Sequence, residues 1–102
     1  MLVQGDVYLV KTRKPATLKK LERTARGIVL AEGEATGHAH TIASLDAVLF
    51  EGKNKELYLE AAKEVQLEHQ EHTTLTIPSG TYKIGIVREH DYFTEEARKV
   101  VD

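Results

Sequence analysis

The five histidines of this 102-residue chain fall into three short groups. Histidine is the commonest metal ligand among side chains, and the only one whose ordinary pKa lies near physiological pH. Five histidines scattered at random would seldom lie so close together, so the first question is whether the groups meet in the folded chain. The groups are His38-Ala39-His40, His69-Gln70-Glu71-His72 and Glu89-His90.

The chemistry that convergent histidines favour is metal binding. Charged imidazoles repel one another and burial disfavours the charged ring, whereas a divalent cation binds the neutral ring. The chain has no cysteine, so nitrogen and oxygen would have to hold the metal. The sequence therefore predicts a divalent metal site, with zinc as the first candidate and iron, manganese or nickel as alternatives. The expected ligands are His38, His40, His69 and His72, with Glu71, Glu89 and His90 as additional candidates.

The sequence leaves open whether such a site is structural or catalytic. Three protein ligands and a water are typical of a catalytic zinc site, and four protein ligands are typical of a structural one. The serines stand in no nucleophile motif, and no glycine-rich phosphate loop is present. We therefore assign no catalytic residue and no substrate from the sequence.

The elements that must position the histidines are predicted to be short strands separated by turns. Residues 60–72 fit either a helix or a strand, and we favour a strand because strands are expected on both sides. Residues 16–25 fit a short helix or a loop, and residues 91–102 a short helix or an edge strand. The pattern predicts one all-β domain over residues 1–102, a small barrel or sandwich with room for one short helix. The expected strands are 3–10, 27–31, 38–44, 47–50, 57–59 and 81–88.

Each histidine group is expected to lie at the end of an apolar stripe, because alternate residues of a strand share one face. Three such stripes lining one small interior would bring their ends together. The stripes are His38 and His40 with Ile42, His69 with Val65 and Leu67, and His90 with Tyr82, Ile84 and Ile86.

The net charge of −2 gives no overall attraction to nucleic acid or to an anionic membrane. Segment 11–26 is an exception, because it carries seven basic residues and one acid, a net charge of about +6. An alternative function is therefore an interaction or assembly module that binds an acidic partner or nucleic acid through this segment. The candidate contacts are Lys11, Arg13, Lys14, Lys19, Lys20 and Arg23. A solvated lysine-rich connection explains the same pattern.

The N-terminus lacks the basic start and apolar run of a signal peptide, and no stretch approaches the ~20 apolar residues of a membrane span. We therefore expect a cytoplasmic protein with no membrane partner. Edge strands of a small β domain favour self-association, so a homo-oligomer is a candidate assembly. A third hypothesis places the histidines in a pH-sensitive contact between subunits.

Two resemblances follow from these motifs. The segments 30–40, His69-Gln70-Glu71-His72 and 77–82 resemble a group of short uncharacterised bacterial and phage proteins, over most of the chain from Gly27 onward. His38-Ala39-His40 followed by Pro78-Ser79-Gly80 is similar to the cupin pattern. That resemblance implies a small β architecture with His38 and His40 as metal ligands. The chain departs from the cupin pattern at Ser44 and Leu45, where a glutamate is expected, and at Lys83, where a histidine is expected.

Overall fold

The computed structural model of the chain describes residues 1–32 and 37–87. The regular elements of these residues are antiparallel strands and one 3-10 turn, so the expected all-β class is confirmed, although the sheets do not close into a barrel. The candidates Glu89 and His90, and the element expected at 91–102, lie outside the described residues. No helix in the described part of the chain is long and apolar enough to cross a membrane.

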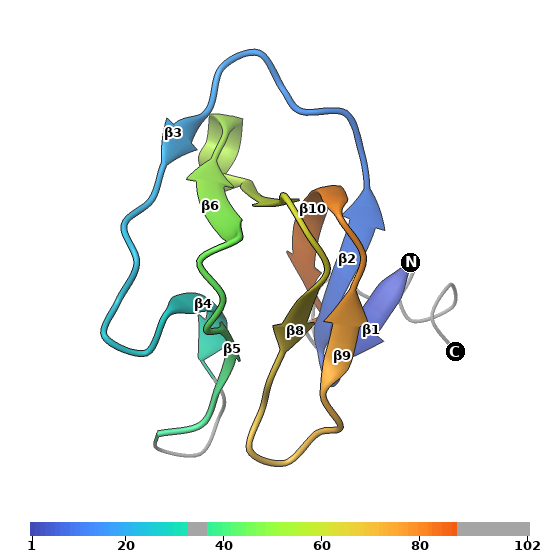
Figure 1. Ribbon diagram of the computed structural model, residues 1–102. Coiled ribbons are helices and arrows are strands. Elements are labelled where there is room, and N and C mark those ends of the chain that lie inside the picture. Colours follow the sequence, from blue (N-terminus) through green and yellow to red (C-terminus); the bar gives the residue numbers. More distant parts are fainter. Residues whose placement is uncertain (33–36, 88–102) are drawn as a thin grey trace.

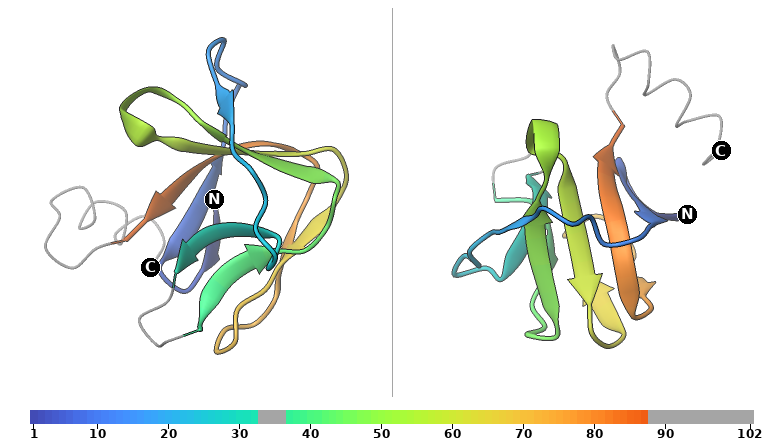
Figure 2. Two further views of the ribbon diagram at one scale, coloured as in Figure 1. Left: turned by 90° about the vertical axis from the view of Figure 1, so that its left-hand side faces the viewer. Right: turned by 90° about the horizontal axis from the view of Figure 1, so that it is seen from above.

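The largest element is a six-stranded antiparallel sheet, which is curved in Figures 1 and 2. Its strands run in the order β1 (Leu2–Gln4), β2 (Val7–Lys11), β10 (Gly80–Ile86), β7 (Leu57–Ala61), β6 (Ala47–Glu51) and β3 (Lys19–Lys20). Strand β10 is central, and its residues Tyr82 and Ile84 are buried on one face, as the alternation of the sequence predicts.

Two further hairpins pack against this sheet (Figure 1). One pairs β4 (Ile28–Glu32) with β5 (Ala39–Ile42), and the other pairs β8 (Val65–Leu67) with β9 (Leu75–Ile77). A backbone bridge between Thr41 and Glu68 joins the hairpins, with N–O distances of 2.9 and 2.8 Å. The core lies between the layers and consists mainly of Val7, Leu9, Ile28, Leu30, Ile42, Leu59, Leu67, Ile77 and Tyr82.

The single strand predicted for residues 3–10 is wrong, because the chain turns at Gly5 and Asp6. Gly5 has a φ of +58°, a left-handed conformation that glycine adopts without the steric cost of a side chain. The turn makes β1 and β2 an antiparallel hairpin, with Gln4 paired to Val7. As a result, both Gln4 and Asp6 lie at the same end of the sheet.

The ambiguous segment 60–72 contains no helix, in agreement with the strand interpretation. Its first residues end β7, and after a turn residues 65–67 form β8 with a buried, exposed, buried pattern. The helical alternative for residues 16–25 is wrong, because this segment contains the short strand β3 and a turn closed by Thr24 and Gly27. Strand β9 was not predicted, since its three residues adjoin the turn at Pro78.

Candidate functional site

Four of the five histidines lie side by side at one end of the molecule. His40 comes from β5 and His38 directly precedes that strand, whereas His69 and His72 lie in the β8–β9 connection. The ring centroids of His40 and His69 are 4.3 Å apart, and those of His69 and His72 are 4.6 Å apart. The His38–His69 and His40–His72 separations are 5.9 and 6.0 Å. We call these four residues the histidine cluster.

Hydrogen bonds hold the β8–β9 connection against β5 and the residues before it on both sides of His69. The bridge between Thr41 and Glu68 lies before it in the chain, and the side chain of Gln70 lies after it. Gln70 Oε1 accepts the Ala39 N–H at 2.9 Å, and Gln70 Nε2 donates to the Gly37 carbonyl at 3.2 Å. Convergence of the rings therefore follows from the pairing of segments about 30 residues apart in the chain.

One buried amide, that of Gln4, fixes the protonation of the central ring. Gln4 is 3% exposed, and its Nε2 donates to the carbonyls of Leu67 at 2.7 Å and Thr73 at 3.0 Å. With both N–H groups used, Oε1 must be the atom that lies 2.8 Å from His40 Nδ1. Since this oxygen can only accept, His40 carries a proton on Nδ1.

This tautomer leaves an unusual contact on the other side of the His40 ring. His40 Nε2 lies 3.2 Å from Asp6 Oδ1, and the His40 side chain is only 2% exposed. In the neutral ring Nε2 is an acceptor, and so is the carboxylate. Among the described residues every buried side-chain nitrogen and oxygen has a partner within hydrogen-bond range. The contact of His40 Nε2 with Asp6 is attractive only with a proton or a metal ion between the two atoms.

The surroundings of His40 disfavour a proton as that cation. Burial is the main cause of a lowered His40 pKa, and the neighbouring His69 lowers it further, whereas Asp6 acts in the opposite direction. The ring is therefore held largely neutral near physiological pH. Its Nε2 lone pair remains directed at the carboxylate.

The remaining rings have different surroundings. His69 Nδ1 accepts the Glu71 N–H at 3.0 Å, and His38 Nδ1 lies 3.6 Å from Glu71 Oε1. The His72 ring lies against the β1–β2 turn, where a Cβ added at Gly5 would come within 2.6 Å of His72 Nε2. The absence of a side chain at Gly5 thus makes room for this ring beside Asp6.

The cluster is not a preformed metal site. Within residues 1–32 and 37–87, no three histidine, aspartate or glutamate side chains are arranged as a group that could hold a metal ion. The ring pair that the sequence predicts, His38 with His40, is also not among the ring contacts of this part of the chain. The arrangement does place the rings of His69 and His72 beside the His40 ring, whose Nε2 faces the Asp6 carboxylate.

Sequence reasoning missed Gln4 and Asp6 because it treated residues 3–10 as one strand. The signal that could have found them is the Gly5-Asp6 pair between two apolar runs, a common two-residue hairpin turn. The contact of a buried amide with a histidine 36 positions later has no counterpart in the sequence pattern.

The basic segment 11–26 is only partly available to a partner. Lys14 pairs with Glu60 at 3.2 Å, and Arg23 donates to the backbone carbonyls of Ala43 and Ala47 at 2.8 and 3.3 Å. Arg23 therefore supports the fold. The candidates with exposed positions and no ion pair in the described residues are Lys11, Arg13, Lys19 and Lys20.

A comparison with protein families matches residues 3–87 to a domain of unknown function, DUF8820. The chain belongs to this family. The matched range contains all four residues of the histidine cluster together with Gln4 and Asp6, so the DUF8820 domain includes every element that forms the site. No curated protein and no solved structure matches the chain.

Proposed function

We propose that this DUF8820 protein binds a divalent metal ion at the histidine cluster, with His40 Nε2 and Asp6 Oδ1 as its first two ligands. The observation that carries the proposal is the contact of two acceptors, at 3.2 Å, on a ring that Gln4 holds in the Nδ1–H tautomer. A metal ion between them would turn this unfavourable contact into two ligand bonds. Gln4 would then be the outer partner that orients a metal-binding histidine.

The spacing of the other rings suits the same ion. Rings that share a tetrahedral ion, with metal–nitrogen distances of about 2.1 Å, have centroids roughly 5 Å apart. The four measured separations in the cluster run from 4.3 to 6.0 Å. Small side-chain rotations would therefore allow His72 and His69 to complete a set of four ligands.

The two additional ligands differ in what they must give up. His72 Nε2 already lies against the turn that carries Asp6. His69 accepts a backbone N–H at Nδ1, so its Nε2 carries the proton in the neutral ring, and the ring must change tautomer before Nε2 can bind metal. We therefore rank His72 as the third ligand and His69 as the fourth, with His38 and Glu71 outside them.

Nitrogen and oxygen ligands in a tetrahedral set suit zinc best, and the ion would not be enclosed. The Asp6 side chain is 58% exposed, so one side of the site faces water. A coordination position open to water is compatible with a catalytic role, but we assign no reaction to it.

Isothermal titration calorimetry of chelator-treated protein with zinc measures the affinity that the proposal predicts, and the chain offers a matched control. Asp6→Asn keeps the shape of the side chain but removes the charge, and we expect it to weaken zinc binding by about tenfold or more. Asp46→Asn makes the same change at an exposed aspartate away from the cluster, and should leave the affinity unchanged. Absence of zinc binding to the unmodified protein, or equal effects of the two substitutions, would overturn the proposal.

A second candidate function is binding of a phosphate-bearing or acidic partner through the basic segment. It is favoured by Lys19 and Lys20, two exposed neighbours in the edge strand β3. Such binding would weaken strongly with added salt, because it depends on release of counterions. Fluorescence anisotropy with a labelled single-stranded oligonucleotide tests this function. The double variant Lys19→Gln, Lys20→Gln is compared with Lys63→Gln, which changes an exposed lysine elsewhere on the surface. Equal binding by the two variants would exclude this function.

A further inference from the structure

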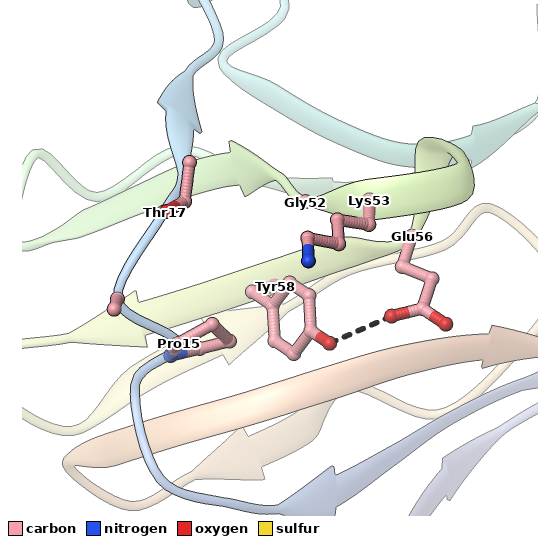
Figure 3. Close-up of a pocket in the computed structure, with 7 residues that line it drawn as sticks. Pro15, Thr17, Gly52, Lys53, Glu56 and Tyr58 are labelled. Carbon is pink, nitrogen blue, oxygen red and sulfur yellow. Dashed lines mark hydrogen bonds between the residues drawn. The ribbon is translucent and has the colours of Figure 1, made fainter.

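A hollow lies beside the connection between β6 and β7 (Figure 3). In Figure 1 this connection lies at the opposite end of the molecule from the β8–β9 connection, which carries His69 and His72. It has a volume of about 310 Å³. Its walls come from the segment that crosses from β2 to β3 and from the β6–β7 connection. We call it the hairpin cleft, and its lining residues are Pro15, Ala16, Thr17, Gly52, Lys53, Glu56 and Tyr58.

Both walls of the hairpin cleft are held in place. The β6–β7 connection contains the 3-10 turn η1 (Lys53–Lys55) and is closed by two backbone hydrogen bonds, Gly52 N–H to Glu56 O at 2.7 Å and Glu56 N–H to Lys53 O at 3.1 Å. The opposite wall follows Lys14, whose ammonium group pairs with Glu60 and lies 4.9 Å from the ring centre of Phe50. Contacts within the fold therefore fix both walls of the cleft.

The lining combines two flat apolar groups. Figure 3 shows the ring of Tyr58 between Pro15 and the turn, with its hydroxyl directed at Glu56. That hydroxyl donates to Glu56 Oε2 at 2.8 Å, which holds the end of the ring at the turn. Gly52 closes the other side, where an added Cβ would come within 2.9 Å of Tyr58 Cε2. A flat ring is the shape that packs best against such a surface.

The charges around the cleft favour an anion. The Tyr58 hydroxyl and then Lys83 Nζ, at 3.4 Å, lower the pKa of Glu56, so Glu56 stays a carboxylate and Lys83 balances its charge. Lys53 lines the cleft and has no ion pair within the residues that the structure describes. The lining itself holds one lysine and one glutamate, and because Lys83 pairs with that glutamate from outside the lining, the charge of Lys53 is left without a counter-charge among the lining residues.

We propose that the hairpin cleft binds a small planar ring that carries an anionic group, with the ring against Tyr58 and Pro15 and the anion at Lys53. A cavity near 300 Å³ is at the lower end of the range for small-molecule sites, so the ligand has one ring system and one charged group. A nucleoside monophosphate and an aromatic carboxylate both have this chemistry. The site is separate from the histidine cluster and does not depend on metal binding.

Amide NMR shifts of the ¹⁵N-labelled full chain test this site with four probes, which are adenosine monophosphate, benzoate, adenosine and inorganic phosphate. We expect saturable shifts at Ala16, Thr17, Gly52 and Lys53 with either of the two planar anions, and the tighter binder identifies the source of the anion. Adenosine or phosphate alone should bind at least about threefold more weakly, since each lacks one half of the ligand.

Two lysines of the same turn give a matched pair of variants. Lys53→Gln should weaken binding by about threefold, the size expected for one exposed ionic contact, whereas Lys55→Gln should not change it. Gly52→Ala, which crowds the Tyr58 ring, should also weaken it. The proposal is overturned if neither planar anion gives saturable shifts in the cleft up to about 10 mM, if phosphate alone binds as tightly, or if both lysine variants behave alike.

Discussion

The substitution Gln4→Met tests whether one buried amide holds the histidine cluster together. Methionine has nearly the same length and volume, so the change removes hydrogen bonds with little change in packing. Three partners lose their bonds, namely the carbonyls of Leu67 and Thr73 and the Nδ1–H of His40. At about 1 kcal/mol for each bond, the expected loss is about 3 kcal/mol of the free energy of unfolding.

Such a loss is large for a chain of this length, whose whole stability is expected to be about 5–15 kcal/mol. Urea unfolding followed by circular dichroism measures it, and with a slope of about 1–3 kcal/mol per molar urea the midpoint should fall by about 1 M or more. Gln66→Met is the control, because Gln66 is exposed in β8 and its side chain accepts a single hydrogen bond among the described residues, from the hydroxyl of Thr76. That control should change stability by less than about 0.5 kcal/mol.

A second measurement separates the role of Gln4 in the site from its role in the fold. In the unmodified protein, the ¹⁵N NMR shifts of the His40 ring should show the Nδ1–H tautomer. In Gln4→Met the Nε2–H tautomer should become populated, because the Nε2 proton can then be donated to Asp6. A loss below about 1 kcal/mol, or a His40 ring that is Nε2–H in the unmodified protein, would refute the reasoning.

Three further predictions concern the same end of the molecule. Gly5→Ala should destabilise the protein by at least about 1 kcal/mol more than Gly37→Ala in thermal unfolding. Both glycines have a positive φ, but of the two only Gly5 is crowded by a neighbour, the ring of His72. Equal losses of stability in the two variants would contradict this prediction. Without metal, the free energy of unfolding should fall as the pH drops from 6.5 through the lowered pKa of folded His40, because the unfolded chain takes up the proton at a higher pH than the folded chain does. His40→Gln should flatten this pH dependence. An unchanged pH dependence in the variant would contradict the prediction. Zinc at about 100 times its dissociation constant should stabilise the folded chain by about 2.7 kcal/mol and raise the melting temperature by about 10–20 °C, whereas magnesium should not.

The secondary structure was largely predictable because the strands of this chain have simple local signals. Strand β10 alternates buried and less buried residues, and β6 and β7 flank a turn rich in glycine, asparagine and lysine. The β1–β2 hairpin was missed because residues 3–10, rich in valine, leucine and tyrosine, were interpreted as one strand although Gly5 and Asp6 interrupt them. There the backbone of Gly5 decides the structure, and the apolar pattern alone does not show it.

The site was predictable only in part, for a different reason. The grouping of His38 with His40 and of His69 with His72 is visible in the sequence, but their mutual approach depends on the pairing of Thr41 with Glu68. Nothing local in either segment encodes that pairing. The roles of Gln4 and Asp6 depend on it as well, because both act on a ring of β5, and the β8–β9 hairpin that contacts β5 also packs against β1.

The division between one fixed ring and several freer ones determines what a metal can contribute. His40 is immobilised by Gln4 within the packed core, whereas His69 and His72 lie in a connection that leaves the core after Leu67 and returns at Leu75. Because the core of the two layers is formed by apolar side chains, we expect the fold not to require the ion, unlike that of a zinc finger. A metal bound here would mainly order the β8–β9 connection against the β1–β2 turn, so part of its binding energy would offset the lost conformational freedom of that connection. The affinity should therefore respond to substitutions that stiffen the connection as well as to those that remove a ligand.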